Sequence, residues 1–387
     1  MTPAARVQAS IEILDDILTG APVEKALTGW ARRSRFAGSK DRAAIRDHVF
    51  DALRCKRSFA ACGGAETGRG LMIGAIRSSG SDLAQMFTGQ RYAPVQVTES
   101  EQGRRFQSDA ERLDIPEWLW PAFQAALKTE VEAVARALQT RASVHLRVNS
   151  RKADLPLAIQ LLSEEGIQAQ PHTACDTALE VTEGARKISQ SRPYTNGLVE
   201  LQDAASQAVV AALELRPGIR VLDYCAGGGG KTLALAARAE GVQVFAHDSN
   251  PSRMRDLPTR ARRAGAEVSI LTTEQVADQA PFDVVLADVP CSGSGSWRRA
   301  PAGKWTLTQE GLNELNRTQT GILRNVAPMV ADGGTLAYAT CSMLAEENDE
   351  IVDEFLSNHT DWRCVFRKTW LVSQGTDGFY TAHLTRI

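Results

Sequence analysis

The chain has 387 residues, of which 43% are hydrophobic and 23% are charged, and its formal net charge is −2. These proportions are typical of a globular protein of two or three domains and exclude a disordered chain. No apolar run approaches the length of a membrane span, and the near-neutral charge gives no overall sign of nucleic-acid binding.

The N-terminus and the cysteines bear on where the protein works. The first residues lack the basic region, apolar core and cleavage site of a secretory signal, so we expect a cytoplasmic protein without membrane contact. The seven cysteines are an odd number without paired spacing. This pattern predicts free thiols rather than a disulfide framework or a metal site.

The first segment is predicted to be helical. Ile11, Leu14 and Leu18 recur at helical spacing, and Gly20 supplies a stop. A second helix is expected with Ser39 as its N-cap, and the glycine-rich stretch 62–70 ends it. Residues 92–103 have the polar character of a linker, so a helical domain over residues 1–95 is predicted.

The pattern changes after this linker. Residues 104–199 read as helix, strand, helix and strand, which predicts a small α+β unit. From residue 200 onward, continuous apolar strands alternate with helical stretches, a pattern that favours a parallel sheet covered on both faces. The last two apolar stretches have no helix between them, so the sheet is expected to end in an antiparallel hairpin.

The segment 221–232, VLDYCAGGGGKT, reads as a strand, a glycine-rich turn and a helix. Such a turn brings backbone donors and a helix N-terminus up to a ligand. It is not a P-loop, because Cys225 stands where that motif needs a glycine before Lys231. It is not a dinucleotide fingerprint either, because Thr232 occupies the third glycine position.

Acidic residues flank this turn. Asp223 precedes it and Asp248 ends the next strand, and a carboxylate there accepts hydrogen bonds from ribose hydroxyls. Because no phosphate cradle is required, S-adenosylmethionine fits better than a nucleotide. The alternative is an ordinary turn with a hydrogen-bonded aspartate.

Two cysteines are predicted at the same edge of the sheet. The sequences DVPC (288–291) and TCS (340–342) both follow apolar strands, and open parallel sheets bind ligands beyond the carboxyl ends of their strands. Methylation of an amino nitrogen calls for a different signature, Asn-Pro-Pro-Tyr or Asp-Pro-Pro-Trp. One aspartate and one or two cysteines instead suit C5 of a pyrimidine, because a thiolate that adds to C6 makes C5 nucleophilic while a carboxyl group neutralises the charge on N3.

These residues resemble the Sun/NOP2 (RsmB/NOP) family of RNA cytosine-C5 methyltransferases, and most of all its bacterial branch that acts on 16S ribosomal RNA. The matching stretches span nearly all of the C-terminal half: VELQDAASQ (199–207), the glycine turn, 282–305, 338–352 and 377–384. LRVNS (146–150) and PEWL (116–119) extend the match upstream. The first segment resembles more weakly the NusB-like RNA-binding domain of this branch.

The resemblance implies a three-part chain. Residues 1–95 would form the all-α NusB-like domain, 104–199 a small α+β RNA-binding or linker subdomain, and 200–387 the catalytic domain. The catalytic domain would be α/β, with the Rossmann-like fold of class I S-adenosylmethionine-dependent methyltransferases and its seven-stranded, mostly parallel sheet.

The resemblance also implies roles. Cys341 would be the nucleophile, Cys291 would help to release the product, and Asp288 would contact the base and the cofactor. Lys231 would be catalytic as well, closing a cofactor loop made of Cys225, Ala226, Gly227, Gly228, Gly229, Gly230 and Lys231.

The remaining cofactor contacts follow from the same resemblance. Asp248 would take the ribose, and Glu274 or Thr273 would replace the acidic residue that contacts adenine in the family. Gly227 and Gly228 stand where the family has Ala-Pro, which leaves the backbone donors in place.

The expected partner is ribosomal RNA. A target cytosine must leave its helix to react, so a single-stranded or loop cytosine is expected. Basic residues concentrate at 31–46, at 252–263 and around 297–305. Such clusters can form a phosphate-binding face, and the alternative for each is a solvated surface. A stacking, phosphate-binding lip is expected beside the base pocket; it consists of Trp297, Arg298, Arg299, Lys304 and Trp305.

Two other functions compete with this one. The first is a non-catalytic RNA-binding assembly factor that retains the methyltransferase scaffold, which the intact Asp288, Cys291 and Cys341 disfavour. The second is DNA cytosine methylation, which the absence of a Glu-Asn-Val motif disfavours. A monomer without a metal is expected.

Overall fold

The computed structural model describes all residues, 1–387, and they form two compact units. The helical unit consists of Met1–Arg141 and Trp297–Thr306, and the sheet unit consists of Ala142–Ser296 and Leu307–Ile387. The three predicted domains, 1–95, 104–199 and 200–387, stay predictions. The two compact units divide the chain elsewhere, at residue 141 and around the segment 297–306.

The helical unit begins with the predicted helix, whose Ile13 and Leu14 are buried in its core. The third helix begins at Ser39, but its N-cap is Gly38 rather than the predicted Ser39, because the Asp41 carboxylate accepts the Gly38 N–H. The helices are α1 (Pro3–Leu18), α2 (Val23–Arg33), α3 (Ser39–Arg54), α4 (Lys56–Gly63), α5 (Gly68–Ser78), α6 (Leu83–Met86), α7 (Asp109–Arg112), α8 (Trp120–Leu127), α9 (Val131–Leu138) and α16 (Ala302–Thr306).

The sheet unit starts with a small antiparallel sheet in the order β2-β3-β1-β4. Two of its strands, β2 and β4, are absent from the sequence-based prediction, because they are short and lie at the edges. The elements of this part are β1 (Val144–Val148), α10 (Leu155–Glu164), β2 (Gln168–Pro171), β3 (Ala178–Glu183), α11 (Arg192–Thr195) and β4 (Val199–Leu201).

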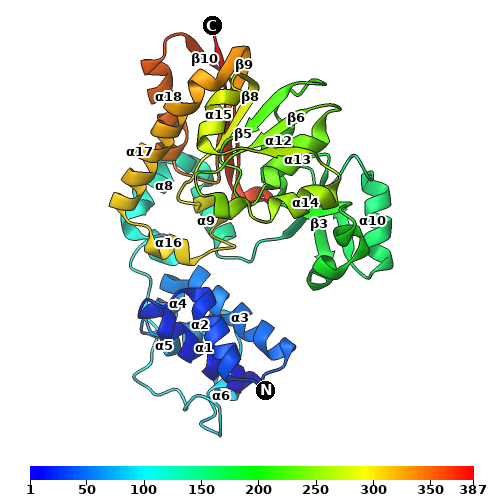
Figure 1. Ribbon diagram of the computed structural model, residues 1–387. Coiled ribbons are helices and arrows are strands. Elements are labelled where there is room, and N and C mark those ends of the chain that lie inside the picture. Colours follow the sequence, from blue (N-terminus) through cyan, green and yellow to red (C-terminus); the bar gives the residue numbers. More distant parts are fainter. The chain divides into compact units, whose positions relative to one another are not determined.

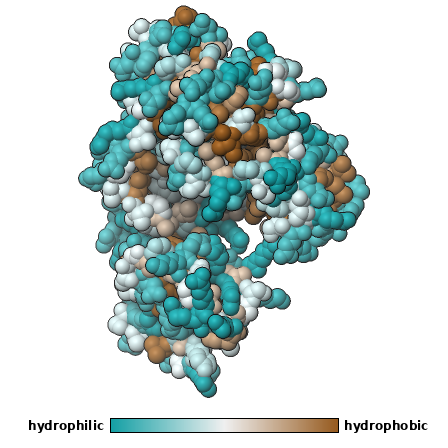
Figure 2. Space-filling view, viewed as in Figure 1, coloured by the Kyte–Doolittle hydropathy of each residue, from teal (hydrophilic) through white to brown (hydrophobic).

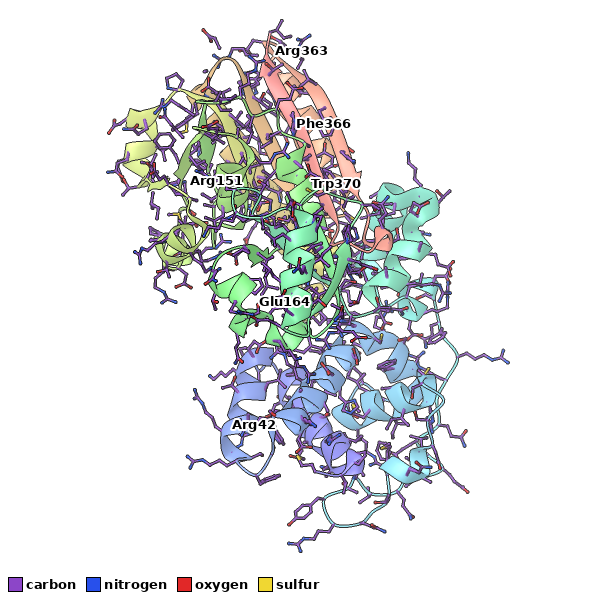
Figure 3. All side chains as sticks on the ribbon, turned by 90° about the vertical axis from the view of Figure 1, so that its right-hand side faces the viewer. Arg42, Arg151, Glu164, Arg363, Phe366 and Trp370 are labelled. Carbon is purple, nitrogen blue, oxygen red and sulfur yellow. The ribbon has the colours of Figure 1, made fainter.

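The large sheet has seven strands in the order β10-β11-β9-β8-β5-β6-β7. Only β11 runs against its neighbours, since it pairs antiparallel with both β9 and β10. The expected hairpin is therefore present, with its second strand inserted beside β9. The strands are β5 (Arg220–Asp223), β6 (Gln243–Ala246), β7 (Val268–Ile270), β8 (Phe282–Asp288), β9 (Val330–Thr340), β10 (Trp362–Trp370) and β11 (Phe379–Arg386); Arg363, Phe366 and Trp370 mark β10 in Figure 3.

Helices cover both faces of this sheet (Figure 1). Successive residues of β8 alternate between two cores, because strand side chains point to opposite faces: Val284 and Leu286 pack with α12 and α13, whereas Val285 packs with α15, α17 and α18. The covering helices are α12 (Ala204–Ala211), α13 (Gly230–Arg238), α14 (Leu257–Ala264), α15 (Thr273–Gln279), α17 (Gln309–Val326) and α18 (Asp349–Asn358). The predicted α/β class with a seven-stranded, mostly parallel sheet is confirmed.

The surface agrees with the composition. On the face seen in Figure 2, hydrophilic residues cover most of the area and hydrophobic residues gather in small groups. No helix combines the length and the apolar character that crossing a membrane requires.

Candidate active site

The glycine turn joins β5 to α13 in a backbone conformation that needs glycine. Gly227 has φ +53° and Gly229 has φ +81°. A Cβ at position 229 would lie 2.3 Å from Leu257 Cδ1, so a larger residue would collide there. Gly227 and Gly229 thus both adopt the left-handed backbone conformation that favours glycine, and Gly229 is the N-cap of α13.

Asp248 follows β6 and binds the backbone of this turn. Its Oδ2 accepts the Gly227 N–H at 2.9 Å, and its Oδ1 accepts the Asn250 N–H at 2.9 Å. An exposed guanidinium, Arg253, lies 3.2 Å from Oδ2. Asp248, the residue predicted to bind the ribose, thus lies beside the glycine turn, and Arg253 is its only charged partner.

Asp223, the other acidic residue of the turn, is the last residue of β5. It is fully buried, and the Thr232 hydroxyl donates to its Oδ2 at 2.6 Å. Burial raises the pKa of this carboxyl to about 7, against the opposing effect of the Thr232 hydrogen bond. Burial also raises the pKa of the neighbouring Cys225 thiol, while the Ala226 N–H donates to the His247 carbonyl at 2.8 Å.

The predicted adenine contacts lie after β7. The Thr273 hydroxyl is 3.0 Å from His247 Nε2, so it already has a partner within the unit. Glu274 is exposed in the first turn of α15, and hydrogen bonds from its own N–H and from Thr272 lower the pKa of its carboxyl. Its contact with adenine stays a prediction.

Lys231 and Asp288 form an ion pair between the first turn of α13 and the end of β8. Lys231 Nζ donates to Asp288 Oδ2 at 2.7 Å and lies 4.7 Å from the centre of the Phe379 ring. Burial pushes the pKa of the Lys231 ammonium down, but the charge and the hydrogen bond of Asp288 more than offset this, so its pKa is raised. The raised pKa keeps Lys231 a cation beside Asp288.

The two predicted cysteines meet beside this ion pair. Cys291 Sγ and Cys341 Sγ are 3.4 Å apart, far beyond the S–S bond length of about 2.05 Å, and both thiols are free. The loops that carry them are also joined through the backbone, because the Gly295 N–H donates to the Cys341 carbonyl at 2.9 Å. Fifty residues of chain separate these two sulfurs in sequence, and the parallel pairing of β8 with β9 brings them together.

The two thiols differ in acidity. The hydrogen bond from Cys291 lowers the pKa of the Cys341 thiol, with Lys231 acting in the same direction. The same hydrogen bond, together with burial and the negative charge of Glu347, raises the pKa of Cys291. Cys341 is accordingly the more acidic thiol of the pair, and Cys291 is the less acidic one.

Sequence reasoning missed the residues that hold these loops. Glu347 follows β9 and is fully buried, and its carboxylate accepts hydrogen bonds from both cysteine loops. Asn348 accepts the Thr340 hydroxyl at 2.6 Å and donates to the Ser342 carbonyl at 3.0 Å. The available signal was the acidic and amide pair Glu347 and Asn348, five and six residues after the end of TCS and within the matching stretch 338–352.

The predicted RNA-contacting lip is wrong for most of its residues. Trp297 is 2% exposed and stacks on Phe123 at 5.9 Å, and Lys304 is fully buried with its Nζ donating to the Arg54 carbonyl at 2.9 Å. Trp305 Nε1 donates to the Leu53 carbonyl at 2.6 Å. Arg298 is also buried, and only Arg299 is exposed. This segment belongs to the core of the helical unit, where its aromatic side chains pack against helices.

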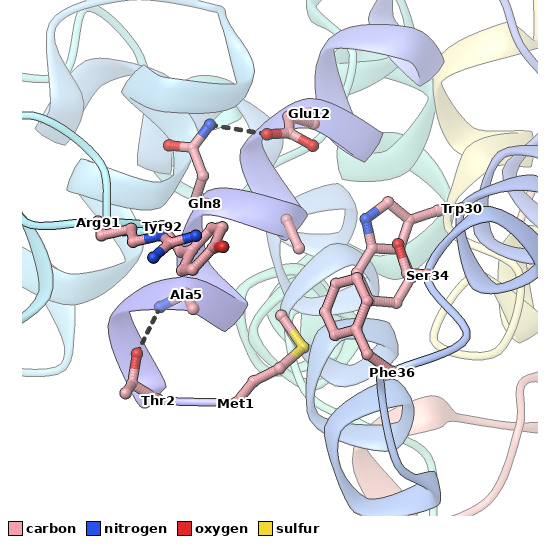
Figure 4. Close-up of a pocket in the computed structure, with 11 residues that line it drawn as sticks. Met1, Thr2, Ala5, Gln8, Glu12, Trp30, Ser34, Phe36, Arg91 and Tyr92 are labelled. Carbon is pink, nitrogen blue, oxygen red and sulfur yellow. Dashed lines mark hydrogen bonds between the residues drawn. The ribbon is translucent and has the colours of Figure 1, made fainter.

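A cavity of about 630 Å³ opens in the helical unit (Figure 4). Trp30 and Phe36 lie on one side of it, and Arg91 and Tyr92 lie on the other. Glu12 is the one acidic residue among its lining residues, and no cysteine or histidine lines it. The cavity therefore lacks a thiol nucleophile like those that the sheet unit brings together at its cysteine edge.

Two family models match parts of this chain. The family model "16S rRNA methyltransferase RsmB/F" matches residues 210–385, and the model of the RsmF/B-like ferredoxin-like domain matches residues 115–187.

Relatives with curated names are similar over part of their length. Ribosomal RNA small subunit methyltransferase B of Citrobacter koseri is 33% identical over 251 residues, which are 64% of this chain and 58% of that protein. The protein of the same name from Photorhabdus laumondii is 30% identical over 284 residues, 70% of this chain and 66% of that protein. The chain thus spans less than two thirds of the length of these relatives.

Solved structures share the fold. The crystal structure of PH0851 has a TM-score of 0.76 at 22% identity and covers 100% of this chain and 99% of that one. A methyltransferase homolog protein from Pyrococcus horikoshii has a TM-score of 0.62 at 21% identity, over 72% of this chain and 97% of that one. The sheet unit has the Rossmann-like fold of class I methyltransferases, and the chain belongs to the RsmB/F methyltransferase family.

Proposed function

We propose that this protein is an S-adenosylmethionine-dependent methyltransferase that modifies C5 of a cytosine in 16S ribosomal RNA. The observation that carries the proposal is the pair of cysteine sulfurs 3.4 Å apart beside the Lys231–Asp288 ion pair. The relatives named ribosomal RNA small subunit methyltransferase B support the choice of substrate.

The residues around the glycine turn fit this cofactor. A carboxylate, Asp248, lies directly beside a turn whose Gly227 and Gly229 carry no side chain over the backbone. Ribose hydroxyls would replace Arg253 at Asp248, which the 58% exposure of the Arg253 side chain permits. When bound, S-adenosylmethionine supplies an electrophilic methyl group.

Cys341 carries the chemistry on the base. Its thiolate adds to C6 of the cytosine. As negative charge develops on N3, the Asp288 carboxyl group passes to N3 a proton drawn from the Lys231 ammonium, which is left neutral. C5 of the adduct is then nucleophilic enough to accept the methyl group. A nearby base removes the C5 proton, and the electron pair of that bond expels the Cys341 sulfur from C6.

Cys291 assists the release. Its raised pKa keeps it protonated, so its S–H donates to Cys341 Sγ at 3.4 Å. A hydrogen bond to the departing sulfur stabilises the thiolate that elimination produces. Without this donor the bond between Cys341 and C6 would persist after methyl transfer.

The helical unit would hold the RNA by its phosphates. Arg32, Arg33, Arg35, Lys40 and Arg42 are exposed on α2, α3 and the turn between them; Arg42 is labelled in Figure 3. The Phe36 ring, 77% exposed, lies among these cations at the cavity of Figure 4. Cations beside an exposed aromatic ring suit a single-stranded RNA, whose phosphates pair with arginine and whose bases stack.

The test is transfer of a labelled methyl group to small-subunit ribosomal RNA from cells that lack the modification. We expect the wild type to label C5 of one cytosine and Cys341→Ala to be inactive. Cys291→Ala should accumulate a covalent protein–RNA adduct, visible as a shifted band on a denaturing gel. Cys364→Ala, a cysteine of β10, is the matched control and should keep wild-type activity.

Two results would contradict the proposal. A wild type that binds RNA but transfers no methyl group would leave a non-catalytic assembly factor as the better description. Activity in Cys341→Ala together with inactivity in Cys291→Ala would reverse the two cysteine roles.

A further inference from the structure

Glu347 connects the two loops that carry the cysteines. It is the last residue of a 3₁₀ turn, Ala345–Glu347, and is fully buried. Its Oε1 accepts the Ser292 N–H at 2.7 Å, and its Oε2 accepts the Ser292 and Ser342 hydroxyls, each at 2.5 Å. Ser292 directly follows Cys291 and Ser342 directly follows Cys341, so one carboxylate binds the neighbour of each thiol.

The rest of the network extends the same connection. Gln319 of α17 donates from one Nε2 to Glu347 Oε1 and to the Pro290 carbonyl, both at 3.0 Å. Ser294 Oγ accepts the Met343 N–H at 2.8 Å, which joins the loops directly in addition to the bond from the Gly295 N–H to the Cys341 carbonyl. The loops are therefore tied at the residues on both sides of Cys291.

The partners of Glu347 are neutral. Its carboxylate receives hydrogen bonds from two hydroxyls, a backbone N–H and a side-chain amide, and no ion pair is present at this residue. A buried carboxylate without a cation costs desolvation energy unless every donor is in place. Such a group is therefore expected where its geometry serves a purpose beyond stability.

We propose that Glu347 is a positioning residue that fixes the separation of the Cys291 and Cys341 sulfurs. It thereby holds the Cys291 thiol where it can donate a hydrogen bond to the Cys341 thiolate. The effect of Glu347 on catalysis rests on the proposed function. Its effect on the separation of the sulfurs does not, because that separation exists in the protein without substrate. The negative charge of Glu347 also raises the pKa of Cys291, which keeps that thiol the donor.

The first experiment measures the geometry without substrate. A bifunctional thiol reagent such as dibromobimane bridges two sulfurs only when they are close, and the Cys291–Cys341 bridge is quantified by peptide mass spectrometry. We expect efficient bridging in the wild type and a fall of about tenfold in the bridging rate in Glu347→Gln, since losing one buried hydrogen bond of about 1.4 kcal/mol changes a population tenfold.

Glu346→Gln is the matched control. It removes the same charge one residue earlier, at a side chain that is only half-buried and that binds neither cysteine loop. We expect its bridging rate to equal that of the wild type. Equal bridging in Glu347→Gln and Glu346→Gln would overturn the proposal.

The second experiment measures turnover. Glu347→Gln should lower kcat about 100-fold with KM for RNA and cofactor almost unchanged, because a misplaced reacting group costs about this factor. A purely structural role would instead leave kcat per folded molecule unchanged. If the wild type transfers no methyl group, the proposed function fails while the bridging experiment still decides the role of Glu347.

A folding defect would not prevent the test. Should Glu347→Gln fail to fold, Ser292→Ala with Ser342→Ala removes the two hydroxyl donors and keeps the carboxylate with its backbone and amide donors. A lower bridging rate in this double variant supports the proposal, and a wild-type rate overturns it.

Discussion

Lys231 and Lys304 are both buried lysines, yet they serve different parts of the molecule. Lys231 of the sheet unit donates to a carboxylate, Asp288, at 2.7 Å, whereas Lys304 of the helical unit donates to a backbone carbonyl at 2.9 Å. Asp288 raises the pKa of Lys231, and burial lowers the pKa of Lys304 to about 8 despite the opposing charge of Asp114. A buried charge with a paired, partly exposed partner is suited to chemistry, while one held by a carbonyl is part of the packing.

The segments that carry these two kinds of environment are neighbours in the sequence. The cysteine loop of the sheet unit ends at Ser296, and Trp297 begins the segment that belongs to the helical unit. Similar residue types therefore have a chemical role on one side of this boundary and a structural role on the other. The following predictions test that division, in order of decreasing expected effect.

Trp297→Ala should destabilise the helical unit by about 3–5 kcal/mol, because it removes a buried aromatic side chain that stacks on Phe123. Urea unfolding measures the change. Trp118→Ala, at a tryptophan of the same unit that is 39% exposed, is the control and should cost much less. Unchanged stability together with weaker RNA binding in Trp297→Ala would restore the interpretation of this segment as an RNA-contacting lip.

Lys231→Met should lower the rate of methyl transfer about 100-fold, the usual cost of losing a charged group at the reacting centre. It should also raise the pKa of the Cys341 thiol, because Lys231 acts to lower it. Single-turnover kinetics and the pH dependence of Cys341 alkylation measure the two effects. Lys304→Met is the control, and an equal loss of rate there would remove the distinction between the two lysines.

Lys304 should make stability depend on pH. Its pKa is about 8 in the folded protein and about 10.4 in an unfolded chain, so the unfolded state binds more protons between these values. The free energy of unfolding therefore rises as pH increases through this window, by about 1–2 kcal/mol between pH 7 and 9.5.

The measurement compares urea unfolding of the wild type and Lys304→Met at both pH values. The stability of the wild type relative to the variant should increase with pH, since only the wild type carries this group. A difference that is constant or falls with pH would show that Lys304 is not held at a lowered pKa.

Arg35→Ala and Arg42→Ala should each reduce the slope of log affinity against log salt concentration for RNA by about 1, as for the loss of one phosphate contact. Filter binding at several salt concentrations measures the slope. Arg46→Ala is the control, because its guanidinium is already paired with Glu24 at 2.6 and 2.9 Å. Equal slopes in all variants would place the RNA contact elsewhere.

The sequence predicted the parts of the site that depend on local pattern. Apolar strands of β8 and β9 ending in DVPC and TCS placed Asp288, Cys291 and Cys341 at one edge, because parallel strands end on the same side of a sheet. The glycine spacing likewise predicted the turn before α13, where Gly229 has no room for a side chain.

Only the tertiary structure decided which polar residues are buried and what they contact. Glu347 contacts Ser292, which lies 55 residues away in sequence, and Lys304 contacts a carbonyl 250 residues away. Local sequence pattern carries no information at such separations. The insertion of β11 beside β9 is decided by strand pairing in the same way. The sequence by itself determined the fold class and the positions of the two thiols at one edge of the sheet. Packing between distant segments decided that Lys231 pairs with Asp288 and that Lys304 stabilises the fold, because burial and hydrogen-bond partners exist only once those segments meet.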